Sequence, residues 1–344
     1  MYFGPMPGSR NLPIIVSIIA TFPQVAGAQQ RQVKTKPPET SATPQERPTA
    51  VAVPQAPRLT IEPKDAVGGS LVRVTIDGLT RNDSARSATG EMAGEPLRFV
   101  PASNGRLQAL GAIPVDGPDS LIARAVVVRA SGATDSLRVL IRIPHEPPPP
   151  TGRGARLSVD SRFTKPLDTK TEERVEHENQ LARDVGKRAQ QTPPLWTFPF
   201  LRPREATVTS RFGTGRVFNG KLTSRHLGVD YRGALGQPIY AANRGVVALV
   251  AEFFLAGNVM YINHGGGLVT GYFHMSKPLV AAGDTVERGQ KIGLVGATGR
   301  VTGPHLHWSA RFGALTVDPA DLLTLGAPFT RPDTLRKKPN PKKG

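Results

Sequence analysis

The residues best suited to chemistry in this chain are histidines, and most of them lie towards its C-terminal end. Seven histidines occur in the 344 residues, and five of these fall between positions 226 and 307. Cysteine is absent, which excludes disulfides, thiolate zinc sites and a cysteine nucleophile. A metal ion bound by this protein must therefore use histidine, aspartate or glutamate.

Two short motifs bring possible ligands together. In His226-Leu227-Gly228-Val229-Asp230 the i, i+4 spacing would suit one helix face, but Gly228 and the β-branched surroundings favour an extended segment. Residues 226, 228 and 230 would then share one face, and Gly228 would leave room for an ion. In His305-Leu306-His307 the spacing of two again projects both imidazoles to one side of a strand. Alone, each motif is weak, because His-x-x-x-Asp occurs often by chance and two histidines in a strand can be a surface pair.

Taken together, the two motifs offer three imidazole or carboxylate ligands. This is the ligand set of a catalytic zinc ion that keeps its fourth position for water. The remaining histidine of the 305/307 pair, and His274, are left over as proton-transfer groups. Such a surplus favours catalysis over a closed structural site.

At these residues the sequence resembles the lysostaphin-type (LytM-like) zinc metallopeptidases, a family of peptidoglycan endopeptidases. The resemblance covers about residues 205–325. It rests on His226-x-x-x-Asp230, Tyr272-x-His274 and Gly299-Arg300-Val301-Thr302-Gly303-Pro304-His305-Leu306-His307-Trp308, flanked by Ser210-Arg211-Phe212-Gly213, Pro238-Ile239-Tyr240-Ala241-Ala242, Gly245-Val246-Val247 and Gly283-Asp284-x-Val286-x-Arg288-Gly289-Gln290.

The resemblance implies a role for each of five residues. His226, Asp230 and His307 would bind Zn²⁺, and His274 and His305 would be the catalytic pair. Two neutral imidazoles and one carboxylate leave such a site positive, which lowers the pKa of bound water and polarises the scissile carbonyl. The two histidines can accept the water's proton, stabilise the oxyanion and protonate the leaving amine. The sequence leaves open which histidine takes which step.

The function predicted on this basis is that of a zinc metalloendopeptidase acting on peptidoglycan, at cross-links or stem peptides, with the substrate class supplied by the family. The alternative is a catalytically silent wall-binding regulator that activates a partner amidase. Such members typically lack one or more of the five positions, all of which are present here. A metal-dependent lectin-like binder, the third option, would have no need of His274 and His305.

Two further residues are open to more than one interpretation. Asn219 could be an extra zinc ligand, as in latent relatives, or the first residue of a plain Asn-Gly turn. His264, in Asn263-His264-Gly265-Gly266-Gly267, is predicted to lie at a hairpin tip rather than on a metal. Some relatives place a transition-state-stabilising tyrosine shortly before the first ligand, and none occurs from Asn219 to Arg225.

A mainly β fold is predicted to position these side chains. Short β-prone runs bounded by glycine, at 245–250, 259–262 and 291–296, predict a compact antiparallel β-sheet domain over residues 196–327. The resemblance implies a metallopeptidase domain of the duplicated hybrid motif type. Alternation with period two at 72–77 and 137–143 predicts a small β-sandwich-like accessory domain over residues 58–145.

The two β regions are predicted to be joined and preceded by connectors. Residues 146–195 begin with a polyproline run, and Thr169-Lys170-Thr171-Glu172 resembles a capping box that opens a polar helix ending before Pro193. This helix is too polar for a core, so it should lie on a neighbouring surface or bridge the domains. Residues 29–57 are too poor in large apolar side chains to fold and are interpreted as a disordered Pro-rich linker.

The N-terminus has the features of a secretory signal peptide over residues 1–28. Arg10 precedes an apolar run, and Ala26-Gly27-Ala28 is a small-residue cleavage site. The bracketing Pro13 and Pro23 leave too few apolar residues for a membrane anchor. We therefore expect an exported protein, periplasmic or extracellular and associated with the cell wall, with no membrane span after cleavage.

The formal net charge of +17 could suggest a nucleic-acid partner, but its distribution argues against one. Residues 328–344 hold six of the basic residues against one aspartate, interleaved with prolines. This pattern predicts a basic disordered tail. Anionic wall polymers or lipid headgroups would be its partners, or it would serve solubility alone.

Overall fold

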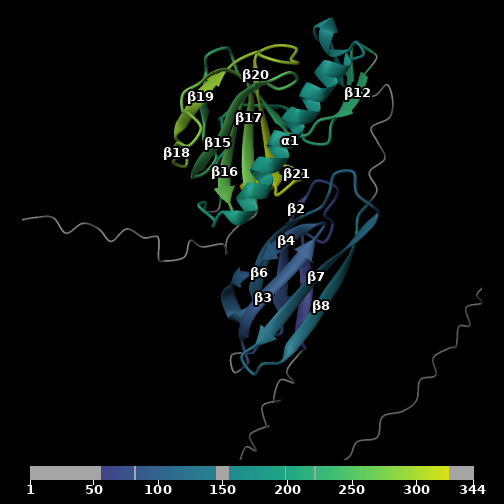
Figure 1. Ribbon diagram of the computed structural model, residues 1–344, viewed down its shortest axis with the longest axis vertical. Coiled ribbons are helices and arrows are strands. Elements are labelled where there is room, and N and C mark those ends of the chain that lie inside the picture. Colours follow the sequence, from purple (N-terminus) through teal and green to yellow (C-terminus); the bar gives the residue numbers. More distant parts are fainter. Residues whose placement is uncertain (1–55, 81–82, 145–154, 198, 221, 325–344) are drawn as a thin grey trace, which may run out of the picture. The chain divides into compact units, whose positions relative to one another are not determined.

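The computed structural model describes residues 56–80, 83–144, 155–197, 199–220 and 222–324 (Figure 1). The predicted signal peptide, nearly all of the 29–57 linker, the polyproline run and the basic tail lie outside these ranges. Within them the protein is mainly β, as predicted. Of the helices described there, none has both the length and the apolar character needed to cross a bilayer.

The N-terminal β region consists of two sheets with a common core. One sheet has the order β1-β2-β6-β5 and the other the order β4-β3-β7-β8. Alternating residues such as Val74 and Val127 point inwards from the two sheets and are fully buried in one apolar cluster. The elements are β1 (Arg58–Glu62), β2 (Leu71–Asp77), β3 (Ala85–Met92), β4 (Glu95–Arg98), β5 (Val100–Pro101), the 3₁₀ turn η1 (Ser103–Gly105), β6 (Leu107–Ala112), β7 (Ser120–Arg129) and β8 (Thr134–Arg142).

The C-terminal region is built on an antiparallel sheet, to which ten strands of the described ranges belong. Its main path runs β10-β13-β20-β17-β16-β15-β18, while β14 pairs with β19, β19 with β17, and β21 with β20. The strands are β10 (Val208–Ser210), β13 (Val229–Arg232), β14 (Pro238–Tyr240), β15 (Gly245–Phe253), β16 (Gly257–Gly265), β17 (Leu268–Pro278), β18 (Thr285–Val286), β19 (Lys291–Val295), β20 (His305–Phe312) and β21 (Leu315–Val317), followed by the short helix α2 (Asp321–Thr324).

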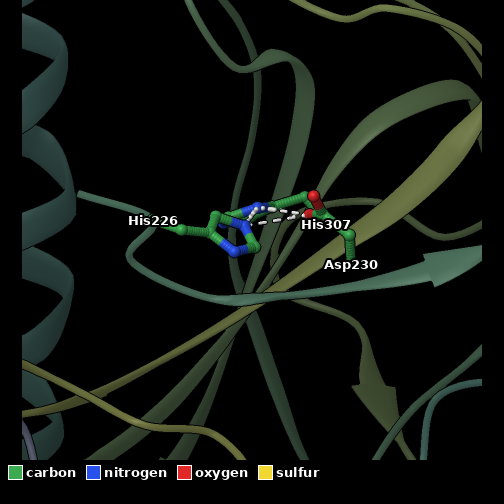
Figure 2. A group of neighbouring side chains, drawn as sticks. All are labelled: His226, Asp230 and His307. Carbon is green, nitrogen blue, oxygen red and sulfur yellow. Dashed lines mark hydrogen bonds and ion pairs between the residues drawn. The ribbon is translucent and has the colours of Figure 1, made fainter. Parts of the chain in front are cut away.

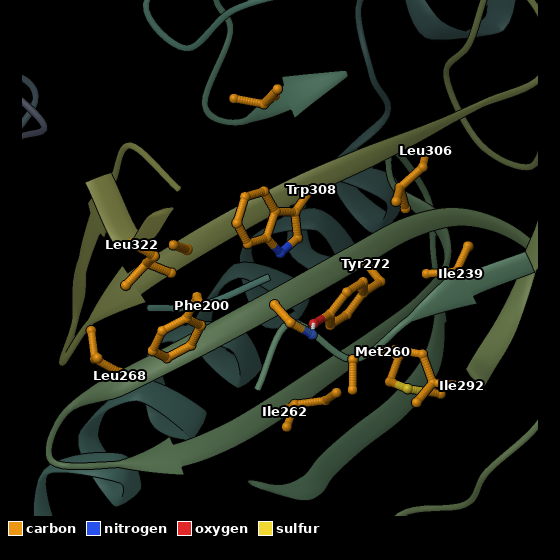
Figure 3. Close-up of a cluster of buried hydrophobic side chains, with 14 of the residues drawn as sticks. Phe200, Ile239, Met260, Ile262, Leu268, Tyr272, Ile292, Leu306, Trp308 and Leu322 are labelled. Carbon is orange, nitrogen blue, oxygen red and sulfur yellow. Dashed lines mark hydrogen bonds between the residues drawn. The ribbon is translucent and has the colours of Figure 1, made fainter. Parts of the chain in front are cut away.

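Apolar side chains on one face of this sheet form its main core (Figure 3). Tyr272 and Trp308 are fully buried there, and Leu306 lies in the same cluster. Because successive side chains of a strand point to opposite faces, burying Leu306 and Trp308 turns His305 and His307 to the other face. Core packing on β20 therefore decides where these histidines point.

A long helix, α1 (Thr169–Gln191), covers part of that other face (Figure 1). Ala182, Val185 and Ala189 form its buried stripe and pack with β16 and β17 residues such as Tyr261 and Val269. The predicted polar helix is thus present and lies on the surface of the C-terminal sheet. Its N-terminus differs from the prediction, because the cap is Asp168, whose carboxylate accepts a hydrogen bond from Thr171 N at 2.8 Å.

A second, smaller sheet lies at the edge of the C-terminal region. The hairpin of β11 (Gly215–Phe218) and β12 (Leu222–Arg225) is extended by β9 (Ala155–Leu157), which pairs in parallel with β11. A 3₁₀ turn, η2 (Ser161–Phe163), follows β9. The segment that leads into α1 is therefore hydrogen-bonded to the hairpin that leads into β13.

Candidate metal centre

Strand register brings Asp230 and His307 together. In the antiparallel pairing of β13 with β20, Asp230 lies directly opposite His307, and Arg232 lies opposite His305. Directly opposed residues have Cβ atoms only about 5 Å apart on the same face. The carboxylate and the imidazole are thus neighbours although they are 77 residues apart in sequence.

His226 reaches the same point from outside a strand. It lies between β12 and β13, and within the predicted extended segment 226–230 the strand begins only at Val229. Gly228 also has a different role from the one predicted. A Cβ atom there would lie 2.5 Å from His307 Nε2 and 2.6 Å from Trp308 O. The missing side chain makes room for the His307 imidazole rather than for an ion.

The three side chains form a compact buried cluster (Figure 2). His226 Nε2 is 3.0 Å from Asp230 Oδ1 and 2.9 Å from His307 Nδ1, and these last two atoms are 2.9 Å apart. His226 Nδ1 lies 2.9 Å from the Arg211 carbonyl oxygen. This contact assigns the imidazole proton to Nδ1 and leaves the Nε2 lone pair directed into the cluster.

The cluster fits a divalent metal ion. Burial lowers the pKa of His307 to about 4, so its imidazole is neutral at pH 7, as a metal ligand must be. Burial disfavours ionisation of Asp230, but contacts with the imidazoles of His226 and His307 outweigh it and hold its pKa below the usual range. Two imidazole nitrogens and one carboxylate oxygen that converge in a buried place are the donor set of a catalytic zinc site.

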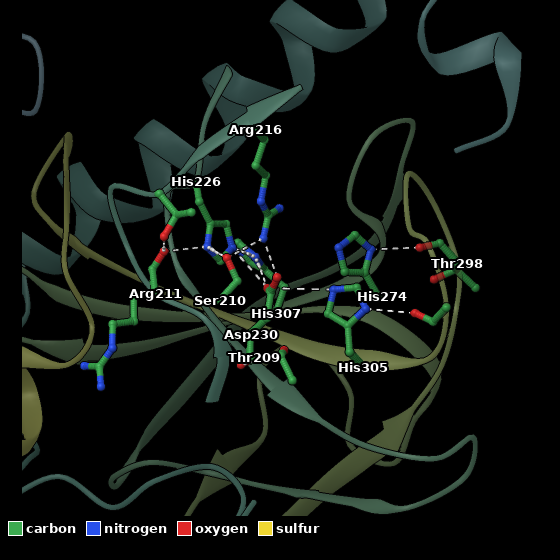
Figure 4. Close-up of polar contacts among 12 residues, drawn as sticks. Thr209, Ser210, Arg211, Arg216, His226, Asp230, His274, Thr298, His305 and His307 are labelled. Atoms are coloured by element: carbon green, nitrogen blue, oxygen red, sulfur yellow. Dashed lines mark hydrogen bonds and ion pairs between the residues drawn. The ribbon is translucent and has the colours of Figure 1, made fainter. Parts of the chain in front are cut away.

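Arg216 is a neighbour of the cluster that sequence reasoning missed. Its guanidinium forms an ion pair with Oδ2 of Asp230, and its Nη2 donates to Ser210 Oγ at 3.2 Å. Ser210 Oγ in turn lies 3.0 Å from His226 Nδ1 (Figure 4). Arg216 is on β11, fourteen residues before Asp230, and no motif links the two positions. Ser210 was noted only as part of a flanking motif.

The two remaining histidines stand beside the cluster with matching orientations (Figure 4). His274 Nδ1 lies 2.8 Å from the Thr298 carbonyl oxygen, and His305 Nδ1 lies 2.8 Å from the Gly303 carbonyl oxygen. Each Nδ1 therefore carries its proton, and each Nε2 is left with a lone pair. The ring centroids are 5.0 Å apart, and His305 Nε2 is 3.7 Å from Asp230 Oδ1.

His274 is held in an unusual state. Its φ is +60°, a left-handed conformation that non-glycine residues rarely adopt, and its backbone N donates to Ala256 O at 3.0 Å. Burial, and then the proximity of His305 and His307, lower its pKa well below the ordinary value. His274 is thus neutral at pH 7, the state in which its Nε2 can accept a proton.

The structure assigns hydrogen-bonding partners to Asn219 and His264. The Asn219 side chain bonds Val159 N at 3.0 Å, Val159 O at 2.9 Å and Thr164 Oγ1 at 3.2 Å, so its amide fastens the segment after β9. His264 is the next-to-last residue of β16 and is fully buried, not at an exposed tip. Its ring nitrogens bond Arg244 O and Thr270 Oγ1, both at 2.8 Å.

A cavity of about 580 Å³ opens beside the cluster. Asp230 and His305 reach it from the sheet, while Leu157 and Val159 line it from the segment around β9. The lining also contains residues 208–211 and 300–304, and Arg216 and Phe218 of the hairpin. A peptide placed there would contact both the cluster and the His305 imidazole.

Comparison with known proteins finds similarity in the C-terminal region. Residues 224–319 match peptidase family M23. Peptidoglycan DD-endopeptidase ShyA of Vibrio cholerae is 48% identical over 102 residues, which are 29% of this chain and 24% of the relative. DD-carboxypeptidase/endopeptidase Mpg of Neisseria meningitidis is 38% identical over 108 residues, 31% of this chain and 25% of the relative. The matched part thus spans about a quarter of these relatives.

A solved structure extends the likeness beyond the matched family segment. The crystal structure of a putative peptidase M23 from Pseudomonas aeruginosa covers 75% of this chain and 94% of its own chain. The two are 25% identical in sequence, with a TM-score of 0.52. The similarity in fold therefore includes residues outside 224–319.

Proposed function

Because residues 224–319 match peptidase family M23, we propose that this protein is a zinc-dependent endopeptidase that hydrolyses peptide bonds in bacterial peptidoglycan. The observation that carries the proposal is the joint geometry of five side chains. Three buried donors of His226, Asp230 and His307 converge within 4.8 Å of one another. His274 and His305 stand next to them with their Nε2 atoms unprotonated.

The chemistry of the site divides between the ion and the two histidines. When bound by His226, Asp230 and His307, a zinc ion supplies Lewis acidity to water and to the scissile carbonyl. His274 and His305 each donate Nδ1–H to a backbone carbonyl, which fixes the ring and makes Nε2 the proton acceptor. Hydrolysis adds hydroxide to the carbonyl carbon and a proton to the amine, so the histidine that takes the water's proton can return it to the leaving group.

The names of two relatives indicate which peptide bond this protein would hydrolyse. ShyA is named a peptidoglycan DD-endopeptidase, and Mpg is named a DD-carboxypeptidase/endopeptidase. This favours a bond between D-amino acids in cross-linked peptides over a glycine bridge. The signal-peptide features at 1–28 support action outside the cytoplasm, in the periplasm or at the cell surface. The basic tail at 328–344 would add contacts to anionic wall polymers or lipid headgroups.

The alternative is a silent regulator that binds the wall and activates an amidase. Nothing in the arrangement of the five side chains favours it, since a regulator needs neither converging metal donors nor two oriented imidazoles. The regulator alternative predicts that the wild type hydrolyses nothing. It also predicts that substitution of His274 or His305 does not change activation of the partner amidase.

Digestion of purified sacculi, followed by mass spectrometry of the released muropeptides, tests the proposal. The exported chain should release peptides cut at one bond type, lose activity with a chelator and regain it with zinc. His274→Ala and His305→Ala should each lower turnover by at least about a hundredfold, the usual scale for losing an acid/base or oxyanion group. The zinc content of both variants should stay at the wild-type level.

His177→Ala is the matched control, because His177 is an exposed histidine on α1 and should leave turnover unchanged. A zinc-loaded wild type that leaves every wall type uncut would remove the enzyme proposal and favour the regulator. If both His274→Ala and His305→Ala hydrolyse the wall at the normal rate, the catalytic roles of these two histidines are wrong, while the proposed zinc ligands are unaffected.

A further inference from the structure

Basic side chains dominate the cavity beside the metal cluster. Arg211, Arg216, Arg232 and Arg300 line it, and Asp230 is the one acidic residue among the described lining residues. The charge of Asp230 is already matched by Arg216 and would be matched again by a bound dication. A ligand that fills this cavity therefore meets a surplus of positive charge.

Among these four cavity arginines, Arg300 is the one that is partly buried and has no ion-pair partner in the described part of the chain. It is half-buried in the loop that precedes β20, and no ion pair involves it in the described part of the chain. Burial, and then the charge of Arg216, lower its pKa. A guanidinium removed from water without an anion is unfavourable, so the site is better completed by an anion than by an uncharged ligand.

The Arg300 guanidinium is also held in place. Its Cζ lies 4.3 Å from the centroid of the Phe218 ring, and the backbone N of Arg300 donates to Leu255 O at 2.8 Å. Phe218 is itself buried at the end of β11, where it pairs with Leu157 of β9. A planar guanidinium stacked on a fixed ring presents its edge N–H groups as a rigid fork.

We propose that Arg300, stacked on Phe218, is a specificity-determining residue that binds a carboxylate of the substrate peptide beside the bond to be cut. The proposal rests on the proposed peptidase function and deepens it, because it states which peptides the site prefers. Two parallel N–H···O bonds from a guanidinium to a carboxylate give both strength and orientation. An uncharged bridge, such as a run of glycines, would leave Arg300 unpaired and should be a poor substrate.

Two matched peptides test the proposal with the full exported chain. They share the sequence around the scissile bond and differ in one group, a free carboxylate on the adjoining residue in one and a primary carboxamide in the other. For the wild type, kcat/KM should be about ten- to hundredfold higher for the carboxylate peptide, the scale of one charge-assisted contact. Arg300→Gln should reduce this preference to about twofold or less, because kcat/KM should fall much further for the carboxylate peptide than for the carboxamide peptide.

Two other variants sharpen the test. Arg300→Lys keeps the charge without the fork and should keep only part of the preference. Arg288→Gln removes an exposed arginine that does not line the cavity and should keep all of it. A wild-type preference that survives in Arg300→Gln would overturn the proposal. So would an equal loss on both peptides, because that result would mark Arg300 as merely structural.

Binding measurements separate this proposal from the proposed catalysis. If the wild type cuts neither peptide, the peptidase function has failed, and calorimetric titration of both peptides still decides the subsite. A carboxylate preference in Kd that disappears in Arg300→Gln would support the subsite in a binding protein. Equal Kd values for the two peptides in the wild type would overturn it.

Discussion

At the scale of single residues, Gly228 sets the position of a proposed zinc ligand. A Cβ atom at this position would meet the imidazole of His307 and the backbone of Trp308, and Trp308 is fixed in the core. Gly228→Ala should therefore displace His307 and weaken zinc binding by roughly tenfold or more, the scale seen when the support of a ligand is lost. Competition with a chromophoric chelator measures this affinity.

Gly303→Ala is the control for that substitution, because a Cβ atom there meets nothing within 4 Å. It should bind zinc as the wild type does. Wild-type affinity in Gly228→Ala as well would mean that His307 does not depend on the space beside it.

The ligand assignment itself has a direct test. His226→Ala and His307→Ala should each lose the ion, since two protein ligands seldom retain zinc. Elemental analysis of the purified variants should find about one zinc per wild-type chain and far less in either variant. Full occupancy in both variants would contradict the ligand set.

Residue types and spacing, together with the resemblance to a known family, predicted which side chains meet here. The spacing of two in His305-Leu306-His307 predicts a shared face, and the structure places both imidazoles beside Asp230. The roles of Gly228 and Arg216 could not be predicted, because each depends on a contact with a residue of another strand. Such contacts follow from the register between strands, which a local pattern does not encode.

At the scale of elements, helix α1 depends on a close approach that only glycine allows. Alanine normally stabilises a helix relative to glycine by about 1 kcal/mol. At Gly186, however, a Cβ atom would lie 1.8 Å from the Gly313 carbonyl oxygen in the β20–β21 turn. Gly186→Ala should thus lower the free energy of unfolding, by about 1 kcal/mol or more.

Chemical denaturation measures this change. Lys187→Ala, at the exposed neighbouring position, should stay within about 0.5 kcal/mol of the wild type. An increase in stability for Gly186→Ala would show that α1 is not in tight contact with the sheet.

The hairpin of β16 and β17 contains a pH-sensitive residue, His264. Burial lowers its pKa to about 4 from an ordinary value of 6.5, so protonation favours the unfolded chain. Its contribution to stability is complete above pH 6.5 and is lost as the pH falls from about 6.5 to about 4. The total loss is on the order of 3 kcal/mol.

Denaturation curves across this pH range, for wild type and His264→Gln, measure the effect. The difference in unfolding free energy between the two proteins should shrink as the pH falls. A difference that does not vary with pH would mean that His264 remains neutral, or is equally protonated, in both the folded and unfolded chains.

Element prediction succeeded where the periodic signal was long. The alternation in β2 and the glycine-bounded runs in β15, β16 and β19 all correspond to strands. The cap of α1 was misplaced by one residue, since Asp168 and Thr169 are both good capping residues. The three-residue strand β9 had no detectable pattern, because so short a segment completes barely one period.

At the scale of the whole molecule, the structure indicates where limited proteolysis should separate the two β regions. The sequence places a polyproline run at 146–150, whereas β9 and α1 are hydrogen-bonded to or packed on the C-terminal sheets. Exposed polar linkers are cut before packed elements. The stable C-terminal fragment should therefore begin before Ala155, and N-terminal sequencing of the fragment identifies its first residue.

A first cut within α1 would contradict that expectation, since it would require the helix to leave the sheet. From sequence alone the helix was assigned to the connector between domains. Its attachment to the sheet depends on the stripe of Ala182, Val185 and Ala189, which is narrow and made largely of alanine. Small side chains give a weak amphipathic signal even where they allow close packing.

The pairing of Asp230 with His307 across β13 and β20 also constrains the order of events during folding. Two of the three donors are 77 residues apart, and a slip of one residue in the register would turn His307 into the core. A newly made chain consequently has no complete site until β20 has paired with β13. Under the proposed function, zinc binding is then a late event that follows assembly of the sheet, and a chain that ends before β20 lacks both His307 of the donor set and His305.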